Sequence, residues 1–525
     1  MKKKVSVSLV LMLCFVMIAS LAGCGSKKGK IQKKSNDDIL KVVDAEWYGI
    51  DAYQIDSSAN FQGLVGEAPF KWDPDNDTIV DGVCTNWTVS EDGKTVTFDV
   101  PEGMFYSTGE QVEPEDVVAS IQHGLDVSPY KDAYTNIESM SADGRQVTLN
   151  LSGYRSDMLY SFCTDFMCII DKAELDSMSN DELMWGCHPY GMFSVKEYVS
   201  GSEVKLIRND KYVTHYPLAE NKGPSHIKEI SDTFNVKDYT ALESLKSGET
   251  DMLCSISNDN KNALKDVADI TIEDVSYPEI DYMELNTDKG IMQDKDLRRA
   301  FLLLINREAL CELTNGGAAP AYSMIYDTMQ NFSPEAKEYF TSKYANNPDE
   351  AIKIIEGKGF SKNADGYYEK DGQVFEVDYY GSSSEISSVM GEGLQGQMAD
   401  YGIKVNLNSI DWNYVHEQAK QDDYHVAVQA LAWAEPILIF NACYHDPTAP
   451  TNTEEYTKAV EDIATTVDTK ERTKKVGELQ KVMFDNLDNV PFFTTKGYMA
   501  HNKYLTGFNI KKDGTYHFND VKWAD

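Results

Sequence analysis

Basic residues are scarce in this sequence. In 525 residues, 49 Lys and Arg stand against 85 Asp and Glu, which gives a formal net charge of −36. Proteins bind nucleic acid largely through Lys and Arg contacts to phosphate, so this balance argues against a nucleic-acid partner. It also keeps the folded chain off an anionic membrane surface, and solubility outside the cell is its simplest explanation.

Common catalytic signatures are missing as well. The chain contains no G-x-S-x-G elbow, no H-E-x-x-H pair and no G-x-x-x-x-G-K-[ST] loop. His188, His416 and His445 show no metal-ligand spacing, so neither a metal site nor a cofactor is expected. We therefore expect a binding protein. An exported enzyme using two of the many carboxylates is the less favoured alternative.

The cysteines form no close C-x-x-C pairs. Of nine, Cys14 and Cys24 lie near the N-terminus, and seven others are scattered along the chain: Cys84, Cys163, Cys168, Cys187, Cys254, Cys311 and Cys443. This odd number does not indicate a disulfide framework or a zinc site, although a Cys163–Cys168 pair stays open. Most are expected to be small core residues, which would suit an organism in reducing surroundings.

The N-terminus has the pattern of an export signal. Lys2, Lys3 and Lys4 precede an apolar stretch over residues 5–18. A transmembrane helix needs about 20 apolar residues, so this stretch is too short to span a bilayer comfortably.

The end of that signal, residues 21–24 (LAGC), resembles the lipobox of bacterial lipoproteins. The resemblance implies cleavage after residue 23 and a lipid on Cys24. The alternatives are an uncleaved anchor helix or a cleaved signal without lipid. Residues 24–38 then read as a flexible tether, because they are largely polar and lysine-rich. Such an anchor is most needed in a Gram-positive cell, where a free receptor would diffuse away.

The rest of the chain alternates between strand and helix patterns. Strands are predicted around Val96–Phe98–Val100 and around Val147–Leu149–Leu151, and a hairpin around residues 200–202. Helices are predicted after Pro114, after Asp294, and over the positions Val476, Leu479, Val482, Met483 and Leu487 just before Pro491. Interleaved strands and helices indicate an α/β or α+β protein of several layers.

Four segments of the chain are informative through their order. They are residues 90–121 (SEDGKTVTFDVPEGMFYSTGEQVEPEDVVASI), 188–212 (HPYGMFSVKEYVSGSEVKLIRNDKY), 282–310 (YMELNTDKGIMQDKDLRRAFLLLINREAL) and 401–415 (YGIKVNLNSIDWNYV). In this order they resemble segments of the extracellular solute-binding proteins of oligopeptide, dipeptide and nickel ABC transporters, known as family 5. Asn306 stands where the family usually has Asp.

The resemblance implies an α/β, two-lobed, periplasmic-binding-protein-like (type II) fold with an inserted subdomain. The first lobe would combine residues 39–71, 188–277 and 491–525, and the insertion would be residues 72–187. The second lobe would be residues 278–490, with chain crossings near Tyr277-Pro278 and Val490-Pro491.

The resemblance also implies a ligand cleft between the lobes. In peptide-binding relatives a carboxylate after a tryptophan holds the ligand amine; here Trp433 matches and Glu435 is the candidate acid, since the expected Asp is absent. Trp412 matches a cleft tryptophan, and Tyr282 lies at a crossing. The competing interpretations are a solvated loop carboxylate for Glu435, core packing for Trp412 and a structural hinge aromatic for Tyr282.

The function implied is capture of a peptide-like ligand by a monomer on the outer face of the cell membrane, for delivery to an ABC permease. Hinge closure around the ligand would require no covalent chemistry. A non-peptide ligand such as a sugar or metal chelate, and a sensor or chaperone using the same fold, are the alternatives.

Overall fold

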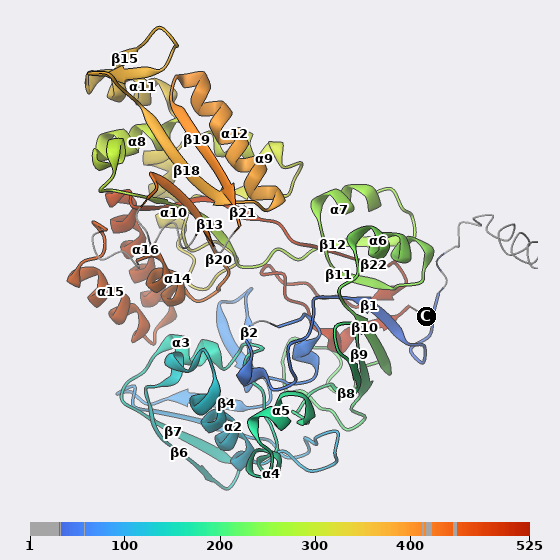
Figure 1. The fold of residues 1–525 in the computed structure, drawn as a ribbon. Helices are drawn as coiled ribbons and strands as arrows, with labels where there is room; N and C mark the ends of the chain where they lie inside the picture. The colour runs from blue at the N-terminus through green and yellow to red at the C-terminus, as the bar shows by residue number, and fades with distance from the viewer. Residues whose placement is uncertain are drawn as a thin grey trace, which may run out of the picture.

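The computed structural model describes residues 31, 33–56, 58–411, 414–415, 423–444 and 449–524. Within these ranges the chain forms three bodies, each built around its own β-sheet (Figure 1). Cys24 and Trp412 lie outside the described residues. No helix in the described ranges is long and apolar enough to cross a membrane.

The first body is a seven-stranded mixed sheet. The central strand β1 pairs in parallel with β10 and β11, while the outer strands pair antiparallel. The strands, in spatial order, are β12 (Ile270–Asp274), β22 (Tyr498–Asn502), β11 (Met252–Ile256), β1 (Leu40–Val43), β10 (Glu229–Thr233), β9 (Glu203–Arg208) and β8 (Phe193–Val199). Helices α6 (Asp238–Ser247) and α7 (Asn258–Leu264) accompany it, and a small pair, β23 (Leu505–Thr506) and β24 (Lys522–Trp523), lies near the end of the chain. Both ends of the described chain therefore contribute to this body.

The second body is a four-stranded antiparallel sheet inserted between β1 and β8. Its strands, in spatial order, are β4 (Thr85–Val89), β5 (Thr95–Asp99), β7 (Gln146–Leu151) and β6 (Ile137–Asp143). Its helices are α2 (Pro114–Val127), α3 (Ser156–Ser161), α4 (Lys172–Ser177) and α5 (Asn180–Gly186), and the hairpin of β2 (Phe70–Asp73) and β3 (Thr78–Asp81) leads into it. Its core merges with that of the first body in one apolar cluster.

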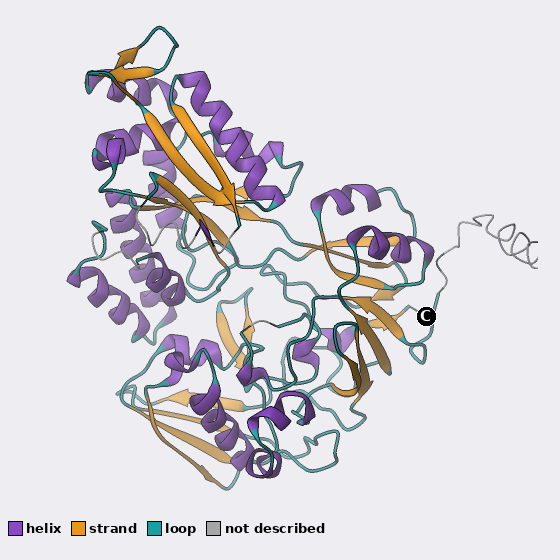
Figure 2. Cartoon of the chain, in the orientation of Figure 1, coloured by secondary structure: helices purple, strands orange, loops and turns teal. Residues whose placement is uncertain are grey.

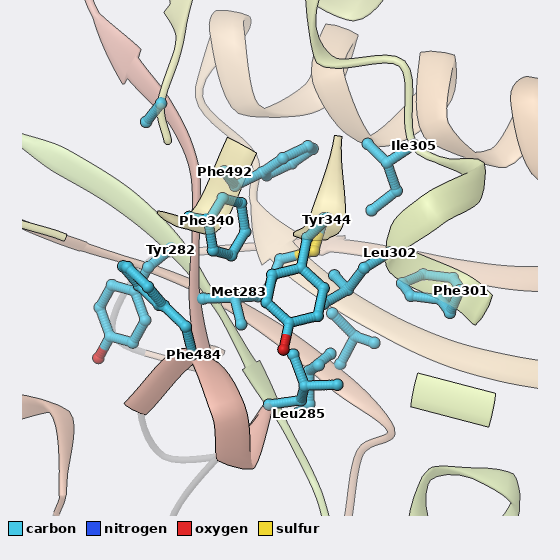
Figure 3. Close-up of a cluster of buried hydrophobic side chains, with 14 of the residues drawn as sticks. Tyr282, Met283, Leu285, Phe301, Leu302, Ile305, Phe340, Tyr344, Phe484 and Phe492 are labelled. Carbon is cyan, nitrogen blue, oxygen red and sulfur yellow. The ribbon is translucent and has the colours of Figure 1, made fainter. Parts of the chain in front are cut away.

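The third body is a six-stranded mixed sheet flanked by helices (Figure 2). The strands, in spatial order, are β14 (Ala318–Pro320), β21 (Asn489–Thr495), β13 (Ile280–Leu285), β20 (Val426–Leu431), β18 (Glu376–Ser382) and β19 (Lys404–Ile410). The helices are α8 (Lys295–Leu304), α9 (Arg307–Leu313), α10 (Pro334–Tyr344), α11 (Pro348–Gly357), α12 (Glu385–Tyr401), α14 (Pro436–Cys443), α15 (Glu454–Ala464) and α16 (Thr469–Asn486). A three-stranded ribbon of β15 (Ser361–Lys362), β16 (Tyr368–Lys370) and β17 (Gln373–Val374) projects from it. This body has a separate apolar core, part of which Figure 3 shows.

Many elements predicted from the sequence are present. The two strands are β5 and β7, and the hairpin is β8–β9, turned at Gly201 with a φ of +70°. Helix α2 begins with Pro114 in its first turn, and the Asp294 side chain caps α8 by accepting hydrogen bonds from the backbone of Asp296 and Leu297. Local periodicity and end signals were sufficient for these elements because they need no distant partner.

The late helix and the second crossing differ from the prediction. Helix α16 ends at Asn486 with Leu487 in the left-handed region at φ +55°, and Val482 is 51% exposed rather than on the apolar face. The predicted crossing at Val490-Pro491 lies inside β21, so the six-stranded sheet retains the chain up to Thr495.

Pro491 did not end the sheet because the strand contains a β-bulge at this point. Tyr282 pairs with Pro491 and its neighbour Asp281 pairs with Phe493, which leaves Phe492 as the extra residue. The Pro491 carbonyl accepts hydrogen bonds from Arg307 Nε at 3.3 Å and Nη2 at 3.0 Å. Arg307 is 1% exposed and lies over the Phe340 ring, 5.2 Å from its centroid; burial lowers its pKa to about 10.

Replacing Arg307 tests this anchor. Arg307→Ala leaves the Pro491 carbonyl without its donor and opens a cavity, so we expect a loss of about 3 kcal/mol in the free energy of unfolding. Arg299→Ala, which removes a partly exposed pair with Glu350, is expected to cost under about 1 kcal/mol. Chemical denaturation measures both; equal losses would refute the anchoring role.

Candidate functional site

The larger of two adjoining cavities lies between the inserted subdomain and the third body. Its volume is about 790 Å³, which is ample for a short peptide or another small molecule. One wall comes from residues 128–134 and 155–167 of the insertion, and the other from residues 432–441 at the β20–α14 loop and α14. In Figure 1, α3 of the insertion and α14 of the third body face each other across this region.

A smaller cavity of about 250 Å³ continues from it into the first body. The two share five lining residues, namely Trp72, Cys163, Asp165, Asp513 and Thr515. The smaller cavity also contains Lys71 and His517, and burial lowers the pKa of His517 to about 3, so this imidazole is neutral.

Trp433 lines the larger cavity, where the sequence predicted a ligand-facing tryptophan. Its side chain is 36% exposed on the short loop between β20 and α14. Pro436 begins α14, and the loop is fixed by a hydrogen bond from Gln330 N to the Ala434 carbonyl, 2.9 Å long. Trp433 is therefore presented to the cavity by a well-anchored turn.

Glu435 lies on the same loop but does not line either cavity. Its side chain is fully buried, caps α14 by accepting from Ile437 N at 3.1 Å, and forms an ion pair with Arg472, which is 5% exposed. Burial raises the pKa of Glu435, and Arg472 opposes that shift. The alternative of a solvated loop carboxylate is wrong. A ligand contact stays a prediction: Oε1 binds Arg472 and Ile437 N, while Oε2 is buried without a hydrogen-bond partner among the described residues.

Tyr282 also lies away from both cavities. It is 1% exposed in β13 and belongs to the core of the third body (Figure 3), where burial raises the pKa of its hydroxyl well above the usual value. The structure thus gives this tyrosine the surroundings of a structural aromatic. Direct contact between Tyr282 and a ligand is not part of this arrangement.

The inserted subdomain contributes cavity residues that were not identified from the sequence. Arg155, Tyr160 and Asp165 all line the larger cavity. Their local sequence has no motif or periodicity that marks them, and they come to share a cavity with Trp433 only in the folded chain. A search confined to the second lobe could not have found them.

Among the described residues, two hydrogen-bonded pairs join the insertion and the β2–β3 hairpin that leads into it to the third body. Arg155 Nη1 donates to Glu461 Oε2 at 3.0 Å, and Asn331 N donates to Asp77 Oδ2 at 3.0 Å. The insertion and the third body therefore touch around the cavity in this conformation.

A family model for bacterial extracellular solute-binding proteins, family 5 Middle, matches residues 78–443 of this chain. The protein belongs to this family. The fold expected from the resemblance is confirmed, since solved two-lobed members align over nearly the whole chain. Members of the family bind solutes for transporters and are not enzymes.

Individual relatives are distant but cover most of the chain. A probable D,D-dipeptide-binding periplasmic protein of Escherichia coli K12 is 22% identical, covering 86% of this chain and 85% of the relative. The ABC transporter substrate-binding protein CtaP of Listeria monocytogenes superposes with a TM-score of 0.78 at 18% identity, covering 94% of this chain and all of that one. NikA of Brucella suis, solved in complex with Fe(III)-EDTA, has a TM-score of 0.77 at 17% identity, and the match covers 93% of this chain and all of that one.

The described residues contain no group of three or more His, Cys, Asp or Glu side chains arranged to hold a metal ion. The seven cysteines outside the N-terminal segment are all free thiols, and six of them are buried. The expectation of small core cysteines is thus confirmed, and Cys163 and Cys168 are not paired. Cys163 is the partly exposed one and lines both cavities.

Glu435→Gln separates the structural role of this residue from the predicted ligand role. Breaking a buried ion pair should lower the free energy of unfolding by about 3 kcal/mol, whereas the exposed control Glu454→Gln, on α15, should cost under about 0.5 kcal/mol. A tenfold or greater loss of peptide affinity in calorimetry, about 1.4 kcal/mol, would support contact with an amine. Unchanged affinity would remove the ligand role.

Thiol chemistry tests the cysteine assignment. In unfolded mature protein lacking Cys24, seven thiols should react with a maleimide, and in native protein Cys163 should react first, because the other six are buried. Mass spectrometry of the labelled peptides identifies the site. A total of one thiol or none in the unfolded protein would show that the cysteines are paired.

Proposed function

We propose that this protein is the substrate-binding lipoprotein of an ABC importer, and that it captures a peptide-like ligand in the larger cavity and passes it to a permease. The observation that carries the proposal is the 790 Å³ cavity between two separately folded walls, within a solute-binding family. Relatives named as peptide-binding proteins support the choice of ligand.

In this proposal the first body and the insertion form one lobe, and the third body forms the other. The chain passes between the two sheets at residues 275–279 and 496–497, so these segments act as the hinge. A ligand that touches both walls binds the closed form more tightly and shifts the population towards it. Cys24 carries the lipid, and the segment after it keeps the receptor beside its permease. The predicted tether of residues 24–38 is too long at its far end, because Ile31 is buried, Lys34 pairs with Asp251 at 2.6 Å and Asn36 accepts a hydrogen bond from Trp523 N.

A second candidate function is binding of a non-peptide ligand such as a metal chelate. The structural similarity to NikA of Brucella suis, solved with Fe(III)-EDTA, favours considering it. The lack of a metal-holding cluster in the described residues means that such a ligand would have to arrive with its own chelator. Adjacent permease and ATPase genes would favour import, and their absence would favour a sensor.

Native mass spectrometry of the purified protein, followed by calorimetry with di- to pentapeptides, tests this function. Trp433→Ala should weaken peptide binding at least tenfold, because an aromatic side chain in the cavity wall is lost. Trp185→Ala is the control, since Trp185 stacks on Tyr198 away from the cavities. Co-purification of a sugar or chelate, with no peptide binding, would overturn the proposal.

A further inference from the structure

The charges that line the larger cavity are unevenly distributed. Among its described lining residues, Arg155 is the one basic side chain, and five are aspartates: Asp56, Asp132, Asp157, Asp165 and Asp513. An excess of carboxylates in a concave site creates a negative potential that attracts cations.

The single arginine is already engaged. Arg155 binds Asp157 through two hydrogen bonds, Nε to Oδ1 at 3.0 Å and Nη2 to Oδ2 at 2.8 Å, and its third nitrogen binds Glu461. It is therefore occupied in joining the cavity walls and is not available to a ligand carboxylate. Asp157 is neutralised by the same contacts.

Asp165, in contrast, has no hydrogen bond or ion pair to its carboxylate within the described part of the chain. It is an exposed residue, and unlike Asp56 and Asp132 it lies where the two cavities meet, so its carboxylate is open to a ligand from both. A Cβ atom on Gly63 would come 2.7 Å from Asp165 Oδ1, so the glycine leaves room for this carboxylate. The nearby Lys71 lies 4.0 Å from Glu67 in an ion pair. The surrounding protein raises the pKa of Asp165, and the charge of Lys71 opposes this shift.

Aromatic rings complete the surroundings. Tyr130 and Phe166 lie with ring centroids 4.9 Å apart in the cavity wall, and Trp72 and Trp433 also line it. Aromatic faces attract ammonium and guanidinium groups through their quadrupoles. Carboxylates and aromatic faces together favour a cation over an anion or a neutral group.

We propose that the larger cavity selects a ligand bearing an ammonium or guanidinium group, and that Asp165 accepts hydrogen bonds from that group. This inference rests on the proposed solute-binding function. In this proposal the inserted subdomain binds the cation of the ligand. Glu435 of the second lobe does not bind it, because Glu435 is engaged with Arg472. The cation comes either from a basic side chain or from the free amine of a peptide.

Calorimetry with the mature protein and matched tripeptides tests the inference. Ala-Lys-Ala is compared with its Nε-acetyl-lysine form, and each is used with a free and with an acetylated N-terminus. We expect at least tenfold tighter binding when a cation is present. If binding depends on the free Lys side chain, the cation is the side chain. If it depends on the free N-terminus, the cation is the N-terminal amine.

Asp165→Asn should reduce this preference to within about twofold, because the amide retains the shape but not the charge. The control Asp143→Asn removes an equal charge from an exposed position at the end of β6 in the same subdomain, and it should preserve the preference. Equal affinity for cationic and neutral peptides, or an Asp165→Asn protein that still discriminates, would overturn the inference.

Failure of the proposed function gives a different result, namely no binding of any peptide. In that case, the rate of maleimide labelling of Cys163 is measured with n-butylammonium and with the neutral 1-butanol. The cation should slow maleimide labelling of Cys163, which shares both cavities with Asp165, in the wild-type protein and not in Asp165→Asn. Equal labelling rates with and without the cation would contradict it.

Discussion

The buried ion pair between Glu435 and Arg472 determines the shape of one cavity wall. Glu435 caps α14 and Arg472 belongs to α16, so the pair joins the β20–α14 loop to the helical layer behind it. Arg472 also donates to Asn331 and to the Ile463 carbonyl, at 3.3 Å in the latter case. Because a buried charge without its partner is strongly unfavourable, this arrangement anchors the loop that carries Trp433.

The opposite wall also contains an ion pair of arginine with a carboxylate, but this pair is more exposed. Arg155 is only partly buried, and it joins the insertion to α15 through Glu461, whose side chain is 61% exposed. An exposed pair of this kind contributes little free energy, so it is easily exchanged for water. A strong pair thus fixes the loop within the third body, and a weak pair connects the two walls. That difference fits the proposed hinge closure, in which the walls separate while each keeps its own structure.

The predictions from the sequence were correct where the structure depends on residues that are close together in the chain. The hairpin at Gly201, the cap at Asp294 and the proline at the start of α2 each depend on residues within a few positions. It was wrong at Pro491, since a proline that normally ends a strand is accommodated by a bulge and by the distant Arg307. Asp165 was not identified, because its position at the junction of the two cavities is set by packing, which no pattern of neighbouring residues reveals.

The sequence by itself determined the family, the α/β architecture and the position of Trp433, because ordered motifs and short-range periodicity record these features directly. The tertiary structure alone decided the surroundings of each carboxylate. Neither the loop of Glu435 nor that of Asp165 carries a sequence motif. Yet Glu435 is buried against Arg472, and Asp165 lines both cavities. The physical reason is that the partner of a charge is set by residues far away in the chain, here 37 positions for Glu435, and packing alone brings them together.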